Sequence, residues 1–218
     1  MSTGIVSLDI LLDEIINDAL SGNQNSLSSI KKRFPSLSDK EALEILKMFS
    51  SVAQKDTDKA ELVATTPPTF SIRTKTTKSV VSSMLEGAKD SILITGYSLS
   101  GYFSEMTDCI IRKSQAGVLV KFYVNDIDSQ SCFDRISKYK SKFLRLYNYP
   151  KQDDSMAALH AKVISVDKRD NLITSANLSY HGQEGNIELG THIISEDIGK
   201  QIDDIFTQLL FKKVFVEV

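Results

Sequence analysis

Two stretches of the chain decide its fold: LHAKVISVD at residues 159–167 and ITSANL at residues 173–178. In an extended strand, residues two positions apart point to the same face, so His160 and Lys162 are expected to project side by side. The apolar residues that follow them predict a strand buried in a sheet. The second stretch predicts another short strand, and it ends in a serine and an asparagine whose polar groups can reach a ligand.

These residue types suit attack on a phosphodiester. The neutral imidazole of His160 is a nucleophile. The Lys162 ammonium and the Asn177 amide can hold phosphate oxygens and offset the charge that grows in the transition state. Such groups do the electrostatic work that Mg²⁺ does elsewhere, so we expect neither a metal nor another cofactor. A His-x-Lys pair alone would indicate a strand-end histidine beside a solvated lysine, but here Asp167 and Ser175 extend the pattern.

The spacing of these residues resembles the HKD signature of the phospholipase D superfamily, His-x-Lys-x4-Asp-x6-Gly-Ser-x-Asn. Thr174 stands where the family usually has glycine. This difference affects how closely a ligand can approach the backbone before Ser175, but it does not change the roles expected of the polar side chains. Downstream, Asn186 and Glu188 match the Asn-x-Glu that follows the signature in the family. The resemblance covers roughly residues 75–211. The signature residues are His160, Lys162, Asp167, Ser175 and Asn177.

The resemblance also implies roles for these residues. Lys162, Ser175 and Asn177 would bind phosphate, and Glu188 would accept a hydrogen bond from an imidazole and so set its tautomer. Asp167 is counted with the catalytic set as part of the signature, although its place at a strand end favours a structural anchor.

Catalysis in the family uses two histidines. One attacks phosphorus to form a phosphohistidine, and the other protonates the leaving oxygen and later activates water. This chain has a single His-x-Lys, at His160. The resemblance therefore implies a homodimer, in which a two-fold axis brings two copies of that histidine to one shared active site.

More narrowly, the whole chain resembles the phospholipase-D-like components of DISARM anti-phage systems. The likeness rests on the Ser-Ala-Asn-Leu segment, on Asn-Ile-Glu-Leu-Gly at residues 186–190, and on a helical region before an α/β core. It implies a nuclease, with DNA as the expected substrate and other defence proteins as expected partners. Two alternatives stay open: a phospholipid hydrolase or transferase, and a non-catalytic subunit that binds nucleic acid.

The composition is that of an ordinary globular protein. The chain has 218 residues, of which 41% are hydrophobic and 25% charged, and its net charge is −2. Because the net charge is slightly negative, the chain as a whole does not have the basic character typical of nucleic-acid-binding proteins. Binding of nucleic acid would therefore need a local basic groove. The chain shows neither a signal peptide nor the ~20 apolar residues that span a bilayer, so a cytoplasmic location is expected. Cys109 and Cys132 are interpreted as packing residues rather than as a zinc set.

The chain is expected to hold two parts. Apolar residues at helical spacing predict helices over residues 1–64, with a capping box at Ser38 and Glu41. This region is interpreted as a small cap on the main domain or as a docking module. The prolines at residues 67–68 mark a linker, and a catalytic domain is expected over residues 70–218.

Strands and helices alternate in the second part. This alternation predicts a three-layer α/β/α domain with a mostly parallel mixed sheet, which agrees with the fold that the resemblance implies. The expected strands are residues 91–97, 118–124, 143–147 and 186–194, besides the two signature strands. The expected helices are residues 77–88, 103–115, 132–139 and 196–211.

Further residues are candidates for binding substrate. Ligand sites in such sheets lie at the ends of strands, and Tyr97 follows one strand as either a pocket wall or an aromatic cap on the core. Asn186 is expected in a flexible loop beside the site. Lys138, Lys140 and Lys142, with tyrosines between and after them, suit a groove that follows a nucleic-acid backbone, or else a solvated edge of the domain.

Overall fold

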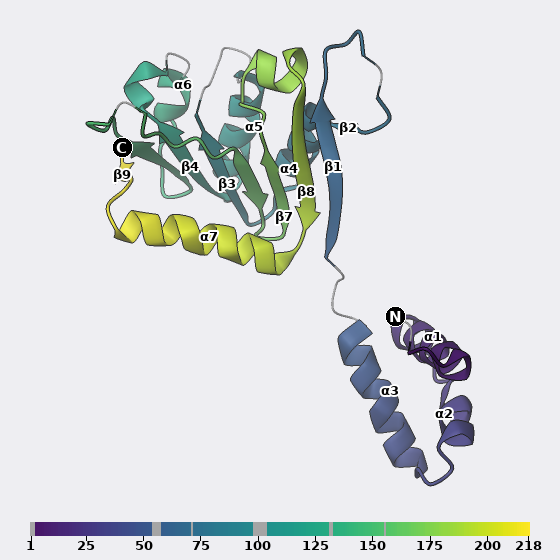
Figure 1. Ribbon diagram of the computed structural model, residues 1–218. Helices are drawn as coiled ribbons and strands as arrows, with labels where there is room; N and C mark the ends of the chain where they lie inside the picture. The colour runs from purple at the N-terminus through teal and green to yellow at the C-terminus, as the bar shows by residue number, and fades with distance from the viewer. Residues whose placement is uncertain (1–2, 54–57, 71, 98–103, 131–132, 155) are drawn as a thin grey trace. The chain divides into compact units, whose positions relative to one another are not determined.

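The computed structural model describes residues 3–218 except 54–57, 71, 98–103, 131–132 and 155. The chain divides into two compact units, Met1–Thr57 and Asp58–Val218. Figure 1 traces both units along the sequence. No helix within the described ranges is long and apolar enough to cross a membrane.

The first unit contains three helices, α1 (Val6–Ser21), α2 (Leu27–Arg33) and α3 (Asp39–Ala53). The capping box that starts α3 is confirmed: the Ser38 amide donates to Glu41 Oε2 at 2.8 Å, and the Glu41 amide donates to Ser38 Oγ at 3.3 Å. These bonds satisfy amide groups that the first helical turn leaves free. The unit has its own small apolar core of Leu11, Ile15, Ile30, Ala42 and Leu46.

The structure corrects the expected end of the helical region at Ala64. Residues Lys59–Thr65 form strand β1, which pairs antiparallel with β8 (Glu188–Ile194) along its full length. The boundary between the units therefore falls at Thr57, and the paired prolines follow a strand inside the second unit. Pairing with a strand more than a hundred residues away decides this conformation, so local periodicity could not reveal it.

The second unit is built on a nine-stranded sheet in the order β2-β1-β8-β7-β6-β3-β4-β5-β9. Three neighbouring pairs are parallel and five are antiparallel. The α/β class is confirmed, but the pairing departs from the expected mostly parallel sheet, because β6, β7 and β8 follow one another without the crossover helix that parallel neighbours need. The remaining strands are β2 (Lys75–Thr76), β3 (Ser91–Gly96), β4 (Leu119–Asn125), β5 (Leu144–Tyr149), β6 (Val163–Val166), β7 (Asp170–Thr174) and β9 (Val216–Glu217).

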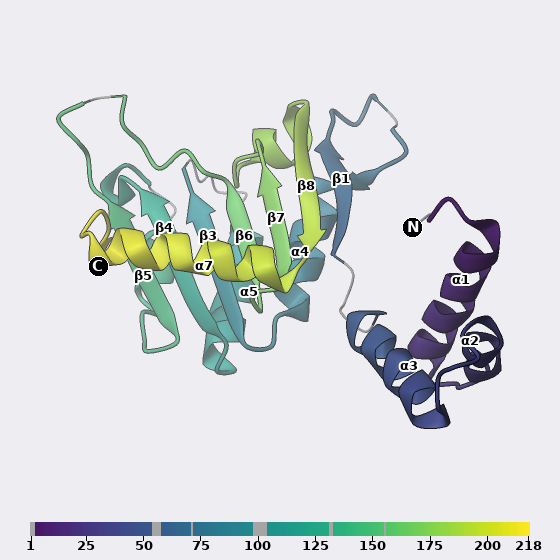
Figure 2. The ribbon, with the colours of Figure 1, turned by 60° about the horizontal axis from the view of Figure 1, so that its bottom comes forward.

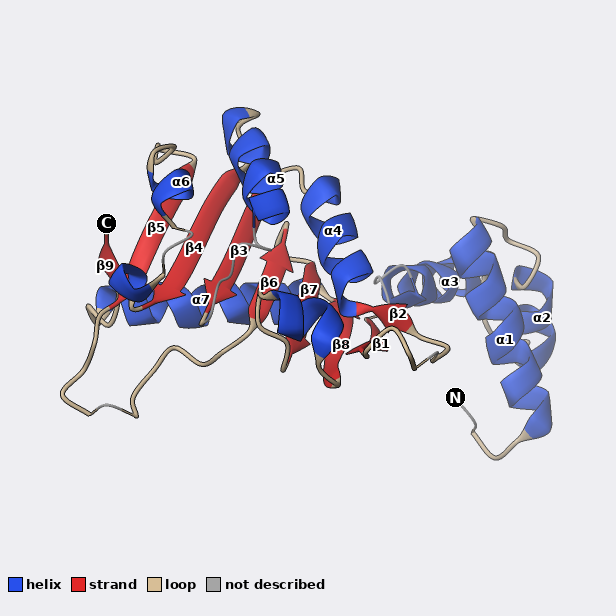
Figure 3. Cartoon of the chain, turned by 90° about the horizontal axis from the view of Figure 1, so that it is seen from above, coloured by secondary structure: helices blue, strands red, loops and turns tan. Residues whose placement is uncertain are grey.

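Helices cover both faces of this sheet. In Figure 3, α4 (Thr77–Gly87), α5 (Ser104–Gln115) and α6 (Asp134–Ser137) lie on one face. The long helix α7 (Glu196–Phe211) crosses the other face, as Figure 2 shows from the front. Ser195 caps α7 by accepting a hydrogen bond from the third amide beyond it. The predicted three layers are present.

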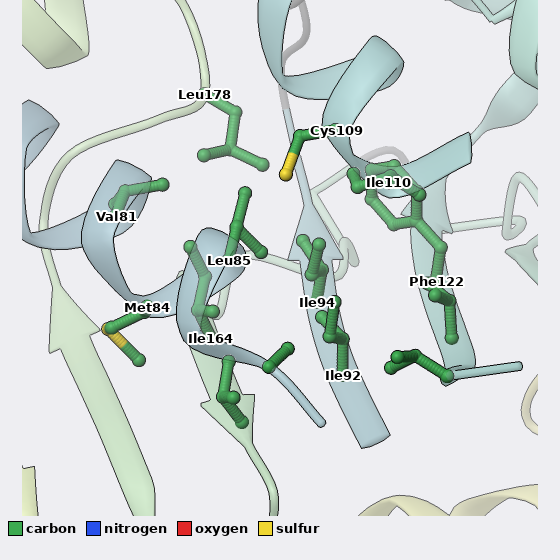
Figure 4. Packing of buried hydrophobic residues seen from close by; sticks show 14 of the residues in the cluster. Val81, Met84, Leu85, Ile92, Ile94, Cys109, Ile110, Phe122, Ile164 and Leu178 are labelled. Carbon is green, nitrogen blue, oxygen red and sulfur yellow. The ribbon is translucent and has the colours of Figure 1, made fainter. Parts of the chain in front are cut away.

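Successive residues of β4 pack into the two different layers, as the alternation of a strand requires. Phe122 is fully buried in the core under α4 and α5, where Figure 4 shows it near Ile94 and Ile110. Tyr123 is equally buried but faces α7, where its ring lies 4.6 Å from that of Phe206. The sheet is therefore held on both sides, which makes it a rigid support for side chains at its edges.

Candidate active site

Antiparallel pairing brings the polar signature segments to one edge of the sheet, which we call the catalytic edge. Strand β3 ends at this edge, and β6 begins there because the two strands are antiparallel. Strand β7 returns to the edge, and β8 starts from it. The residues carried by these strand ends are Tyr97, His160, Lys162, Ser175, Asn177, Asn186 and Glu188.

His160 and Lys162 precede β6 rather than lying in it, and both contact Tyr97. The rings of His160 and Tyr97 are 4.5 Å apart at an interplanar angle of 73°. Lys162 Nζ lies 4.9 Å from the centre of the Tyr97 ring and donates a hydrogen bond to the His160 carbonyl at 2.8 Å. Tyr97 therefore lies against both signature side chains, and its role as a pocket wall or as an aromatic cap stays a prediction. The aromatic face also suits the lysine cation.

Two side chains from neighbouring strands hold the backbone around His160. Asn125, at the end of β4, accepts a hydrogen bond from the Leu159 amide at 2.8 Å. The Thr95 hydroxyl in β3 donates to the Ala161 carbonyl at 2.7 Å. The sequence alone did not identify Thr95 as a site residue. A hydroxyl group within an otherwise apolar strand was the only feature that pointed to it.

Glu188 connects the second group of site residues. Its Oε2 accepts a hydrogen bond from Ser175 Oγ, and its Oε1 accepts one from Asn186 Nδ2 at 3.0 Å. The expected bond from an imidazole to Glu188 is not among the hydrogen bonds of the described residues. Within one chain, this carboxylate therefore orients the serine and the asparagine rather than His160.

Burial lowers the pKa of Lys162, and the negative charge of Glu188 partly opposes that shift. The lowered pKa means that the folded protein disfavours the ammonium form, because the cation has lost some of its hydration. A negatively charged phosphate oxygen placed beside Lys162 would stabilise its ammonium group in place of the lost water.

The variant Lys162→Met should therefore resist urea at neutral pH as well as the wild type does, or better. Both the folded and the unfolded wild type carry the ammonium at that pH, so the cost of burying it is fully present there. The cost fades as the pH rises through the lowered folded-state pKa towards that of the unfolded chain. Unfolding curves near neutrality and at alkaline pH measure this difference. A clearly lower midpoint for the variant at neutral pH would show that the ammonium stabilises the fold.

Asn177 is positioned by a single π-helical turn, η3 (His181–Gly185), in the segment expected to be a loop. Gln183 is buried, and its Nε2 donates to the Asn177 carbonyl at 3.0 Å. Gly182 packs so closely that a β-carbon there would lie 2.3 Å from the same carbonyl oxygen. The turn and the Asn177 backbone therefore form one packed element.

Asp167 lies away from the site, at the far end of β6. Its carboxylate accepts hydrogen bonds from the amides of Lys89, Asp90 and Ser91 at 3.0, 2.7 and 2.8 Å. Its backbone is left-handed, with φ at 52°. The catalytic assignment that came with the signature is therefore wrong in this structure, and the anchor interpretation describes the contacts.

We expect Asp167→Ala to destabilise the protein by about 2–4 kcal/mol, because it leaves several amides without their acceptor. Asp167→Asn should cost clearly less, because the asparagine keeps one acceptor oxygen and tolerates a left-handed backbone. Urea unfolding of the two variants measures the difference. Unchanged stability with lost activity in Asp167→Ala would instead support a chemical role.

The three lysines of the basic run lie away from the catalytic edge. Lys138, Lys140 and Lys142 are exposed and lead from α6 to the start of β5. Because β5 runs parallel to β3 and β4, it begins at the opposite edge of the sheet. Of the two interpretations, the structure thus favours a solvated edge of the domain. These lysines do not line the site.

Several known proteins are similar to this chain in sequence or in fold. Residues 81–210 match the family described as "Cardiolipin synthase, PLD-like domain". The chain is 36% identical over 169 residues to the DISARM protein DrmC of Bacillus paralicheniformis, an alignment covering 75% of this chain and 69% of that protein.

Three solved structures are similar to this chain in fold. Nuc from Salmonella typhimurium, a phospholipase D family member, has a TM-score of 0.54 at 16% identity, covering 74% of this chain and 98% of that one. NucT from Helicobacter pylori has a TM-score of 0.57 at 18% identity, covering 74% and 99%. Phosphatidylserine synthase from Haemophilus influenzae has a TM-score of 0.54 at 12% identity, covering 84% and 48%. At these identities the likeness is one of fold.

Proposed function

The chain belongs to the phospholipase D superfamily, and from this premise we propose that it is a metal-independent phosphodiesterase that cleaves nucleic acid in anti-phage defence. The observation that carries the proposal is the contact of His160 and Lys162 with Tyr97, at the edge where Glu188 holds Ser175. The similarity to a DISARM protein supports the defence role. With a nucleic-acid substrate inside the cell, the protein would act in the cytoplasm.

The proposed reaction has two steps. A ring nitrogen of His160 attacks phosphorus, the bond to the leaving oxygen breaks, and a second histidine protonates that oxygen. Water then attacks the phosphohistidine, the same second histidine takes its proton, and the phosphorus–nitrogen bond breaks. Lys162 and Asn177 would hold the phosphate oxygens throughout and stabilise the growing charge.

We propose that a second copy of the chain supplies the second histidine. An exposed apolar patch on the α7 face of the sheet supports this dimer. Leu62, Ile173 and Leu189 are 62%, 44% and 59% exposed, and cross-strand register puts them on one face. The Leu189 amide donates to Ser175 Oγ at 3.2 Å, so the patch reaches the site itself. Exposed apolar area of this kind is typical of contacts between subunits.

A phospholipid substrate is the second candidate, because the matching family is described as cardiolipin synthase. The similarity to a DISARM protein is what favours nucleic acid over phospholipid. The basic run of Lys138, Lys140 and Lys142 does not support it, because these lysines lie at the edge of the sheet opposite the catalytic edge. Incubation with labelled DNA, RNA and phospholipid vesicles in EDTA separates these candidates. Nucleic-acid cleavage supports the proposal, vesicle turnover supports the alternative, and binding without cleavage indicates a non-catalytic subunit.

A further inference from the structure

We infer that a cavity beside the catalytic edge binds the base of an unpaired nucleotide next to the phosphate held at His160. The inference rests on the proposed function and deepens it, because it names single-stranded nucleic acid as the substrate. The cavity has a volume of about 350 Å³. That volume is in the range of small-ligand sites. Its walls come from the end of β1, the connection from β1 to β2, the start of α4 and the turn η3.

The cavity and the phosphate site share a wall. Thr65, which lines the cavity, lies directly opposite Glu188 in the pairing of β1 with β8. Gln183, which also lines it, is bonded through Nε2 to the Asn177 carbonyl. Figure 1 shows the β1–β2 connection rising beyond the end of β1, beside the start of β8. A nucleotide held in the cavity would therefore adjoin the phosphate at the site.

Two residues that line the cavity each carry a buried oxygen atom without a hydrogen bond among the described residues. Gln183 and Thr65 are 2% and 1% exposed, and within the described part of the chain neither Gln183 Oε1 nor Thr65 Oγ1 has a hydrogen bond. Buried polar atoms in folded proteins are nearly always paired, so such atoms point to a ligand or water. A base offers an N–H group to the amide oxygen and a ring nitrogen or carbonyl to the hydroxyl.

The outer wall of the cavity is apolar and aromatic. Phe70 and Ile72 line it and are 59% and 48% exposed. The backbone at Phe70 is held in a turn, since the Phe70 amide donates to the Pro67 carbonyl at 2.9 Å. An exposed aromatic ring at the mouth of a polar cavity is the arrangement on which unpaired bases stack.

The charges around the cavity also favour a base over a phosphate. Lys78 and Glu184 both line the cavity and form an ion pair at 2.6 Å, so their charges cancel. The exposed Arg73 lies in the β1–β2 connection, where it can contact the backbone of a bound strand. In a duplex the Watson–Crick edge of each base is paired and its faces are stacked on neighbouring bases, so only an unpaired base can enter the cavity and stack on Phe70.

The experiment measures binding in a His160→Ala parent, which keeps the oligonucleotide intact. The probes are a labelled single-stranded DNA of mixed sequence, the same strand with abasic central positions, and the matching duplex. We expect Phe70→Ala to weaken binding of the first probe about tenfold, the order contributed by one base–aromatic stack. Phe34→Ala is the matched control, because Phe34 is an exposed phenylalanine of the helical unit and should change nothing.

Thr65→Val separates a ligand role from a structural one. Valine has nearly the shape of threonine, and the hydroxyl it removes has no partner in the described structure. The variant should unfold at the same or a higher denaturant concentration, yet bind the single strand several-fold more weakly. The abasic strand and the duplex should bind the parent more weakly than the intact strand and should be insensitive to both substitutions.

Equal affinity of the parent for intact and abasic strands would overturn the inference, as would unchanged binding in both Phe70→Ala and Thr65→Val. Either result leaves nucleic-acid cleavage in place as the proposed function. Failure of the parent to bind any of the three DNA probes, together with turnover of phospholipid vesicles by the wild type, would overturn the function and the inference together.

Discussion

Replacing His160 with alanine is expected to lower phosphodiester cleavage in EDTA by at least about a thousandfold, because the covalent step then has no nucleophile. Folding should be unaffected, since His160 is exposed and its ring contact is with Tyr97 at the surface of the site. Cleavage assays and unfolding curves of the same preparation measure both effects.

His181→Ala is the matched control for this prediction. His181 is also an exposed histidine, but it lies in η3 and outside the signature. Its replacement should leave most of the activity. If EDTA stops the wild type and Mg²⁺ restores it, the two-step histidine mechanism is wrong. Rapid quenching at alkaline pH, which preserves a phosphorus–nitrogen bond, should trap a labelled phosphoenzyme in the wild type and none in His160→Ala.

Mixing wild-type and His160→Ala chains is expected to give less activity than the wild-type fraction alone predicts. If each active site needs two His160 side chains, only dimers of two wild-type chains complete the reaction. An equal mixture that has exchanged subunits should then keep about one quarter of the activity, whereas independent sites would keep about one half. A fully active monomer in sedimentation at the assay concentration would refute the shared site.

The apolar patch allows a sharper test of the same dimer. Leu62→Arg introduces a charge into the patch and should weaken the dimer by at least about tenfold, with activity recovering at high protein concentration. Ile205→Arg is the control, because Ile205 is 55% exposed on α7 and lies outside the patch. If Leu62→Arg leaves the dimer intact, the two-fold contact lies elsewhere on the molecule.

The sequence by itself determined the elements whose signals are local. Helix α7 begins and ends where predicted, because Ser195 caps its start and its apolar residues keep one helical spacing. The sequence also placed His160 and Lys162 in one site, and in the structure both side chains contact Tyr97, although the two residues precede β6 rather than lying in it. Their closeness in sequence keeps them in one segment, but their shared contact with Tyr97 depends on the pairing of β3 with β6.

Only the tertiary structure decided the features that depend on partners far along the chain. Strand β1 is extended because it pairs with β8, although the last element before it in the described chain is helix α3. Asp167 belongs to the same signature as His160, yet the length of β6 carries it to the opposite edge, where three amides hold it. The basic run of lysines is separated from the site by the direction of β5.

Some residues of the candidate site could be identified from the sequence, and others only from the structure. Residue types and spacing identified the polar groups, because chemistry constrains which side chains can attack and bind a phosphate. Spacing could not show that Thr95 and Asn125 position the histidine segment, or that Thr65 and Gln183 face one cavity. These residues come from separate strands and turns, and they become neighbours only when hydrogen bonds between strands set the register of the sheet.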